Sequence, residues 1–326
     1  MTGAITDTPD LGRVAAGEPT PDLEARLEAV ERPLAHHLVV DDARLMARLN
    51  CTPALHRVVP TPAAVALARV RARCEWRLSP SRREQMRERA RAVAAPGTKD
   101  ADVEALARKV LREQCVQTEL SWRPWDARRM AVHGIEHLDA ARASGRGTIL
   151  VNVHAGPFLN LVHAIAARGH KVYLSGGRSL DEPPLSGHDG LWTKTQNAMI
   201  EDAGCRWVRR GGSYELVEAL LRRGELAWMS FDARGELVVP LLGRTVGVRS
   251  GIAQLACATG ATLIPAFAVR EGLGQVGLLL EPIEPGDAGP AKLTDRLARA
   301  IDTVLAPRRA EAHAVMARLL ERGAPR

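Results

Sequence analysis

Short apolar runs alternate with amphipathic helical stretches from about residue 131 onward, and this alternation restricts the fold more than any other feature of the chain. Helical stretches such as SYELVEALLRRG and SGIAQLACATG separate the apolar runs, which are TILVNVH, KVYLSGG, GCRWVR, ELAWMSFD and ATLIPAFAV. Strands joined through helices run parallel in one sheet, because right-handed crossovers place the helices on both faces. The sequence therefore predicts an α/β fold with a mostly parallel central sheet.

The chain before residue 131 has a different pattern, which is helical and interrupted by prolines. In SPSRREQMRERARAV, Ser79 or Ser81 is a candidate helix cap, and residues 100–120 place an apolar face on a second helix. We predict three parts. Residues 1–20 are a flexible N-terminus, residues 21–130 are a helical region packed on the core, and residues 131–326 are the α/β domain, which closes with two amphipathic helices split at Pro307.

The composition agrees with a large aliphatic core. A chain of 326 residues can bury one as a single α/β domain with a helical appendage or as two modest domains. Apolar residues make up 46% of the chain but aromatic residues only 3%, so Leu, Val, Ala and Ile must fill the core. This favours helices and buried parallel strands.

Lys and Arg exceed Asp and Glu by 45 to 38, which gives a formal charge of +7. This balance is compatible with CoA phosphates, an acidic carrier protein, anionic lipid headgroups or nucleic acid. The sequence has no zinc-finger spacing, no aromatic RNA-stacking signature and no basic arm. We therefore expect no nucleic-acid partner.

The cysteines and the hydropathy pattern predict a cytoplasmic protein. The five cysteines are far apart and form no Cys-x-x-Cys pair, which is typical of free thiols in a reducing compartment. No run approaches the roughly 18 apolar residues of a membrane span, and the start MTGAITDTPDLGRV does not resemble a signal peptide.

The stretch VNVHAGPFLN, residues 151–160, carries the first candidate for chemistry. Alternation along the strand places Asn152 and His154 on one side, and Pro157 suits the first position of a following helix. An imidazole at a strand end beside a helix N-terminus suits a base that deprotonates a hydroxyl or an amine attacking a thioester. A histidine hydrogen-bonded in a loop crossing explains the same residues equally well.

Five more residues follow strands or begin a helix, and each has a plain structural alternative. Asp232 and Arg234 in SFDARGE suit an acceptor pocket, or an ion pair that fixes the loop. Arg178 suits a phosphate or an acidic acceptor, or is a solvated side chain. Arg249 and Ser250 at a helix start suit an anionic headgroup or the pantetheine phosphate, although serine there is often a helix cap.

Two blocks of the sequence resemble the lysophospholipid acyltransferase superfamily, especially its lauroyl/myristoyl (lipid A) and phosphatidylinositol mannoside acyltransferase branch. These blocks are GIEHLDAARASGRGTILVNVHAGP and SFDARGELVVPLLGRTVGVRSGIAQLACATGATLIPAFAV, and the likeness covers roughly residues 40–320. The resemblance implies a sheet flanked by helices, and transfer of an acyl group from acyl-CoA or acyl carrier protein to an alcohol or amine, without a permanently bound cofactor.

The family signature is His, four residues, then Asp or Glu. His154 matches the histidine, but Leu159 occupies the position of the acid, which in the family orients and polarises the ring. Three explanations stay open. Another side chain replaces the acid, the histidine acts unaided on a nucleophilic amine, or the fold does other work. The candidate replacements are Asn152, Asn160, Asp181, Glu182, Asp189 and Asp232, of which topology favours Asp232.

The motif HGIEH, residues 133–137, has the spacing of some zinc peptidases. Because His133 is expected to end a strand and Gly134 to break the helix, we predict no metal site. The N-terminus is polar where lipid A acyltransferase relatives commonly begin with an apolar anchor. We therefore expect either peripheral contact with the membrane through a basic apolar surface or a soluble acceptor.

We expect an enzyme that transfers an acyl group from a CoA or carrier-protein thioester to a lipid or small-molecule acceptor, with His154 as the base. Two alternatives stay open. One is a repurposed member that acts on a carrier-protein-tethered small molecule by substitution, cyclisation or hydrolysis. The other is a non-catalytic partner subunit. His154 is expected in a cleft at the carboxyl end of the sheet, with Leu159 lining it and Asp232 within reach.

Overall fold

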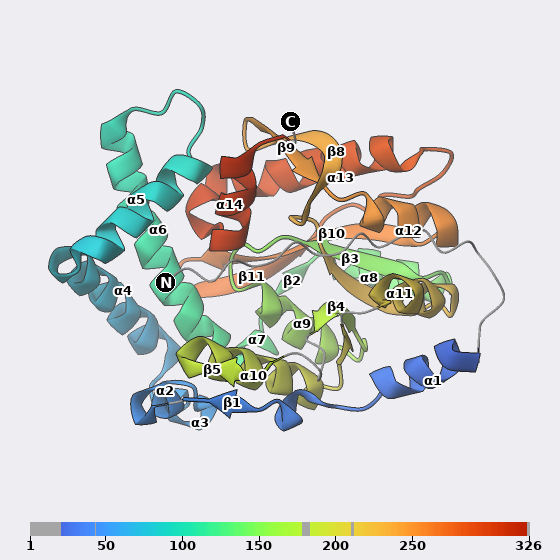
Figure 1. Ribbon diagram of the computed structural model, residues 1–326, viewed down its shortest axis with the longest axis horizontal. Coiled ribbons are helices and arrows are strands. Elements are labelled where there is room, and N and C mark those ends of the chain that lie inside the picture. Colours follow the sequence, from blue (N-terminus) through green and yellow to red (C-terminus); the bar gives the residue numbers. More distant parts are fainter. Residues whose placement is uncertain (1–20, 43, 178–182, 210–211, 325–326) are drawn as a thin grey trace.

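The structure is a computed structural model that describes residues 21–42, 44–177, 183–209 and 212–324 (Figure 1). The N-terminus predicted to be flexible, residues 1–20, lies outside the described residues, as do Arg178, Asp181 and Glu182. Within the described part of the chain, no helix is both long and apolar enough to cross a bilayer.

A seven-stranded, mostly parallel sheet forms the centre of the molecule, as the alternating pattern predicts. Its strands, in spatial order, are β2 (Val132–His133), β11 (Gly274–Leu279), β10 (Thr262–Glu271), β3 (Thr148–Asn152), β7 (Leu226–Ser230), β4 (Tyr173–Gly177) and β6 (Arg206–Arg209). The five strands from β10 to β6 run parallel to their neighbours, and β11 is antiparallel to β10. The parallel strands therefore share one carboxyl edge.

Two apolar layers cover the sheet, one on each face. The first joins Ile149 and Val151 of β3 to helices α11 (Ser213–Arg222), α12 (Gly251–Thr259), α13 (Pro290–Leu305) and α14 (Ala314–Arg322). The second joins Leu150 to helices α8 (Ile135–Ala143), α9 (Phe158–Ala166) and α10 (Gly187–Asp202). Because neighbouring residues of β3 point to opposite faces, the strand is buried on both sides.

The chain before the sheet is helical, as predicted. Its helices are α1 (Pro21–Val30), η1 (Ala35–His37), α2 (Leu45–Asn50), α3 (Pro53–His56), α4 (Thr61–Leu78), α5 (Pro80–Val93), α6 (Asp100–Ser121) and α7 (Pro124–Ala127). Helices α4, α5 and α6 pack around a small core of their own and lie beside the sheet domain in Figure 1. Ser79 caps α5, because its Oγ accepts a hydrogen bond from the N–H of Arg82 at 3.3 Å.

Pro307 separates α13 from α14, as predicted, and lies in the 3-10 helix η2 (Ala306–Glu311). Other elements were not expected from the sequence. They are the antiparallel hairpin of β8 (Arg234–Leu241) and β9 (Arg244–Val248), strand β11, and the parallel pair of β1 (Val40–Asp41) and β5 (Leu185–Ser186). Most of β8 alternates between exposed and more covered residues, a weaker pattern than that of a strand buried on both faces.

Candidate active site

The ends of two neighbouring strands bring His154 and Asp232 together. Strands β3 and β7 pair in parallel, with Asn152 opposite Ser230. Each of the two candidate residues lies two positions beyond its member of that pair, at the carboxyl edge of the sheet. Since functional groups of such sheets gather beyond the carboxyl ends of strands, this is where a site is expected.

The carboxylate of Asp232 holds His154 at two points. Its Oδ1 lies 2.8 Å from Nδ1 of the imidazole, and its Oδ2 accepts a hydrogen bond from the backbone N–H of His154 at 3.0 Å. The side chain of Asp232 is 1% exposed, whereas that of His154 is 31% exposed. The predicted proximity of the two residues is confirmed, and the imidazole keeps a face open to solvent.

The neighbouring charges determine the protonation of the ring. Burial alone lowers the pKa of His154, but the hydrogen bond and the negative charge of Asp232 outweigh burial and raise it above its usual value. Arg318 in α14 acts in the opposite direction. In the neutral ring, an ionised Asp232 favours the proton on Nδ1, which leaves Nε2 as a proton acceptor.

The C-terminal part of the chain fixes the loop that carries His154. The backbone N–H of His313 donates to the carbonyl of His154 at 2.8 Å, and Nε2 of His313 lies 2.9 Å from the carbonyl of Gly156. The ring of Phe158 meets both imidazoles edge-on, with centroid distances of 5.1 Å to His154 and 5.6 Å to His313. Burial lowers the pKa of His313 to about 3, so this ring is neutral near pH 7 and donates its Nε2 proton to Gly156.

Glu311 also holds the loop that carries His154. Its carbonyl accepts the N–H of Gly156 at 2.9 Å, and its Oε2 accepts the N–H of Arg270 at 3.2 Å. Burial raises the pKa of the Glu311 carboxyl to about 7. Gly156 has a φ of +60°, and a Cβ there would come within 2.1 Å of the carbonyl oxygen of Ala268. The turn after β3 therefore requires glycine.

Leu159 points into the core. It is 9% exposed and belongs to the apolar layer of α8, α9 and α10, so the expectation that it lines a cleft is not supported. The reason is its place on the first turn of α9, whose apolar face packs on the sheet.

The other described candidates for the missing acid bond elsewhere. The amide of Asn160 donates to the carbonyl of Leu120 and to Gln275. Asp189 contacts His188. Of the described candidates for the missing acid, Asp232 is the one bonded to His154.

The residues predicted to bind substrate have mixed surroundings. Asn152 is fully buried and accepts a hydrogen bond from Ser230 at 3.1 Å, so a substrate would reach it only if the surrounding chain moved. Arg234 and Arg249 are exposed beside one another, and Nε of Arg249 donates to the carbonyl of Arg234 at 3.2 Å. Their proposed contacts with an acceptor stay predictions. Arg178 lies outside the described residues.

Ser250 bonds to a carboxylate, and this contact argues against the phosphate site predicted at the N-terminus of α12. Its backbone N–H donates to Oε1 of Glu236 at 3.2 Å, and its hydroxyl donates to the same oxygen. An anion at the N-terminus of α12 would therefore meet a carboxylate. Ser250 is also not a side-chain cap of α12 in the usual sense, since its hydroxyl makes no cap hydrogen bond.

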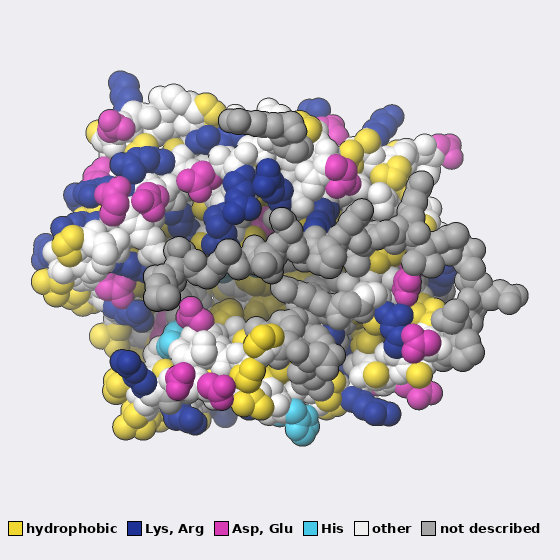
Figure 2. All heavy atoms as spheres, in the orientation of Figure 1, with side chains coloured by type: hydrophobic (Ala, Val, Ile, Leu, Met, Phe, Trp, Pro, Cys, Tyr) yellow, Lys and Arg dark blue, Asp and Glu magenta, His cyan; other side chains and the backbone are white. Residues whose placement is uncertain are grey.

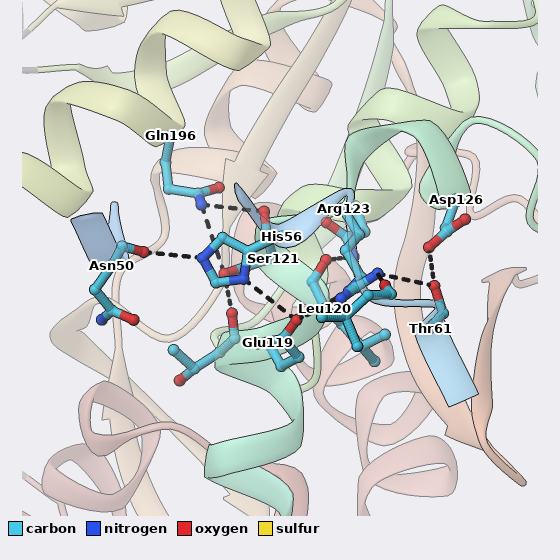
Figure 3. Close-up of polar contacts among 12 residues, drawn as sticks. Asn50, His56, Thr61, Glu119, Leu120, Ser121, Arg123, Asp126 and Gln196 are labelled. Carbon is cyan, nitrogen blue, oxygen red and sulfur yellow. Dashed lines mark hydrogen bonds and ion pairs between the residues drawn. The ribbon is translucent and has the colours of Figure 1, made fainter. Parts of the chain in front are cut away.

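Glu311, His313 and Arg318 were not predicted from the sequence. These residues lie more than 150 positions after His154, and the fold brings the backbone of Glu311 and His313 into contact with the loop. A second polar cluster, between the N-terminal helices, was not predicted either. There Arg123 donates to Glu119 at 2.8 Å, and His56 lies 3.3 Å from the same carboxylate (Figure 3).

The motif HGIEH is divided as predicted, because His133 ends β2 and Gly134 adopts the left-handed conformation before α8. Among the described residues, His, Cys, Asp and Glu side chains form no group of three or more that could hold a metal ion.

Comparison with known families defines the class of the protein. The family model described as bacterial lipid A biosynthesis acyltransferase matches residues 126–319, which include His154, Asp232 and His313. The match covers more than half of the chain. The protein therefore belongs to the bacterial lipid A biosynthesis acyltransferase family. No curated protein matches the chain at a significant level.

Proposed function

We propose that the protein transfers an acyl group from a thioester of CoA or acyl carrier protein to an alcohol or amine, with His154 as general base and Asp232 as its orienting acid. The contact that carries this proposal is the 2.8 Å distance between Nδ1 of His154 and Oδ1 of Asp232. The family signature has an acid at the position of Leu159, and in this proposal Asp232, which follows the neighbouring strand β7, takes the place of that acid.

The reaction follows from the protonation of the ring. Nε2 of His154 takes the proton from the acceptor hydroxyl or amine as its oxygen or nitrogen attacks the thioester carbonyl carbon. The tetrahedral intermediate then breaks its C–S bond, and the departing thiolate takes the proton back from the imidazolium. Asp232 stabilises the imidazolium without itself becoming protonated. The N-terminus of α9 begins close behind His154, where a helix favours negative charge.

Basic residues at this site suit a phosphorylated donor. Arg318 of α14 is exposed and is close enough for its charge to lower the pKa of His154. Figure 2 shows dark blue Lys and Arg side chains gathered over α14. We propose that Arg318 contacts a phosphate of the donor. Both CoA and the pantetheine arm of a carrier protein present such a phosphate.

The test is mass spectrometry of wild-type protein and the His154→Ala variant, each incubated with acyl-CoA or acyl carrier protein and a panel of lipid, sugar and amine acceptors. The proposal predicts an acylated acceptor with wild-type protein and a loss of about 100- to 10,000-fold with His154→Ala. The same rate for both proteins would remove His154 from the chemistry.

The same experiment separates the two alternatives. Conversion of a carrier-bound small molecule by substitution, cyclisation or hydrolysis, without acyl transfer, would indicate a repurposed member of the family. Intact substrates in every reaction would favour a partner subunit without catalysis. The bonded pair of His154 and Asp232 favours catalysis over the second alternative.

A further inference from the structure

Residues 44–78 carry an unusual combination of exposed apolar side chains and positive charge. Eight of the eleven large hydrophobic side chains that are exposed in the described residues lie in this segment, which is about a tenth of the chain. They are Leu45, Met46, Leu49, Leu55, Val58, Leu67, Val70 and Leu78. The segment also contains seven arginines and one glutamate, so its formal charge is +6. Figure 2 shows hydrophobic side chains along the edge of the molecule where α2, α3 and α4 lie.

Helix α4 has two apolar faces. The inner face is formed by Ala64, Val65, Ala68 and Ala72, which are buried in the core of the N-terminal helices. The outer face repeats at intervals of three or four residues, which places its members one above the other on the helix. It consists of Leu67, Val70, Cys74 and Leu78, all of them exposed. The inner face explains how α4 packs in the fold, but the outer face has no role in that packing.

Arginines border the outer face of α4. Arg73 and Arg77 are exposed on one side of the apolar stripe, and Arg71 lies on the other, where it pairs with Glu75 at 2.6 Å. Arg69 donates to the carbonyl of Gly272, which places the exposed Leu273 of the β10–β11 turn beside the helix. Besides Glu75, acidic residues lie at the α2 side, at Asp41, Asp42 and Asp189. The basic apolar surface is therefore centred on α4.

A cavity of about 450 Å³ opens between α2, α3, α4 and α6, and its rim includes Leu49, Leu55 and Leu67 of the same surface. The polar groups in its floor bond to one another (Figure 3). Arg123 donates to Glu119 and to the carbonyl of Val59, and Nε2 of His56 lies 2.9 Å from the carbonyl of Asn50. Because these groups are already partnered, the hollow favours alkyl chains over a charged headgroup.

We propose that the α4 surface, comprising the outer face of α4 with its bordering arginines and the apolar side chains of α2 and α3, docks on an anionic lipid bilayer. Apolar side chains that project outward beside a row of arginines fit the boundary between headgroups and acyl chains. Arginine near such a surface is attracted to anionic headgroups. A second copy of the chain would present the same positive charge, and the mutual repulsion disfavours a dimer through this face.

Two exposed cysteines allow a direct test on the full chain. Cys74 lies within the proposed surface and Cys257 lies on α12, whereas Cys51, Cys115 and Cys205 are buried. An environment-sensitive fluorophore attached to Cys74 in the Cys257→Ser variant reports on the α4 surface. The same fluorophore on Cys257 in the Cys74→Ser variant is the matched control.

With vesicles that contain phosphatidylglycerol, the Cys74 probe should shift to the blue and be quenched by lipids that carry a quencher in their acyl chains. The Cys257 probe should not respond, and neutral phosphatidylcholine vesicles should have little effect on either. No response of the Cys74 probe to anionic vesicles would overturn the proposal. A concentration-dependent blue shift without vesicles would indicate self-association through this face and would also overturn it.

Charge variants test the same surface without a label. Arg73→Gln combined with Arg77→Gln should lower the partition coefficient on anionic vesicles on the order of 30-fold. The control combines Arg222→Gln of α11 with Arg299→Gln of α13, which removes the same charge from exposed positions elsewhere. An equal loss in both pairs would show attraction through net charge alone and would contradict a surface centred on α4.

Discussion

Asp232 contacts His154 twice, through its Oδ1 at 2.8 Å from the ring Nδ1 and through its Oδ2 at 3.0 Å from the backbone nitrogen. The second contact fixes the carboxylate relative to the strand end, and the first then fixes the ring. A carboxylate with 1% exposure cannot exchange these partners freely for water. The imidazole is therefore held in one orientation before any substrate arrives.

Replacing Asp232 by asparagine should lower turnover by about 100- to 10,000-fold, because the amide neither stabilises an imidazolium nor selects the productive tautomer. The amide has nearly the shape of the carboxylate, so the fold should persist. Steady-state kinetics give the turnover, and circular dichroism with thermal melting is the control for folding. Unchanged turnover in a folded variant would leave the family fold without an identified acid.

The pH dependence of the reaction should follow the raised pKa of His154. A base must be unprotonated, so kcat/KM should rise with pH through an apparent pKa above the usual value for histidine, about 6.5. Asp232→Asn should move this limb to lower pH. Arg318→Gln should move it to higher pH, because the arginine lowers the pKa, and Arg322→Gln in the same helix is the control. If neither variant shifts this rise in the pH profile, a group other than His154 controls the pH dependence of kcat/KM.

The same shift links His154 to stability. Its folded-state pKa lies above the unfolded value, so the ion pair with Asp232 contributes stability below about pH 6.5, and this contribution is lost as pH rises through the folded pKa.

Leu159→Glu restores the acid of the family signature but should not make acyl transfer faster. Asp232 already occupies Nδ1, and position 159 points into the apolar layer. A buried carboxylate without a partner should cost on the order of 2 to 4 kcal/mol, measured by urea unfolding. Leu159→Met, which preserves the volume, should cost less than about 1.5 kcal/mol. A Leu159→Glu variant of wild-type stability with faster acyl transfer would show that the ring accepts a second acid.

Glu311→Gln should stabilise the protein at high pH more than at low pH. The pKa of Glu311 is raised to about 7, so the folded state holds this proton more tightly than the unfolded state does. The wild type therefore loses stability as pH rises from about 4.5 through about 7. A gain on the order of 1 to 3 kcal/mol is expected at pH 8, and a smaller one at pH 5. Equal gains at both pH values in urea unfolding would place the ionised carboxylate in a better solvated environment.

The sheet and the His154–Asp232 pair could be predicted because each depends on a local signal. Strands buried on both faces are apolar throughout, and a polar residue after such a run marks the strand end. The order of the strands in the sheet could not be predicted from such local signals. Whether β3 and β7 are neighbours depends on which helix covers which face of the sheet. The sequence therefore supported only the weaker prediction that the two strands are adjacent or nearly adjacent.

The surroundings of the pair could not be predicted, because they come from contacts between segments far apart in the chain. His313 and Glu311 lie in the connection between α13 and α14, where polar residues ordinarily face solvent. Both nevertheless bond to the loop after β3. Ser250 was expected at a helix N-terminus open to anions. It meets Glu236 instead, because the unpredicted hairpin of β8 and β9 places that carboxylate beside it.

The central claim is that Asp232 makes Nε2 of His154 the proton acceptor, and nitrogen NMR of the imidazole tests it without knowledge of the substrate. Long-range proton–nitrogen correlation spectra of ¹⁵N-labelled protein report which ring nitrogen carries the proton, and the His154→Gln variant assigns the signal among the ten histidines. We predict a neutral ring protonated at Nδ1, with a pKa above the usual value, and loss of both properties in Asp232→Asn. A ring protonated at Nε2 in the wild-type protein above that pKa would contradict the account.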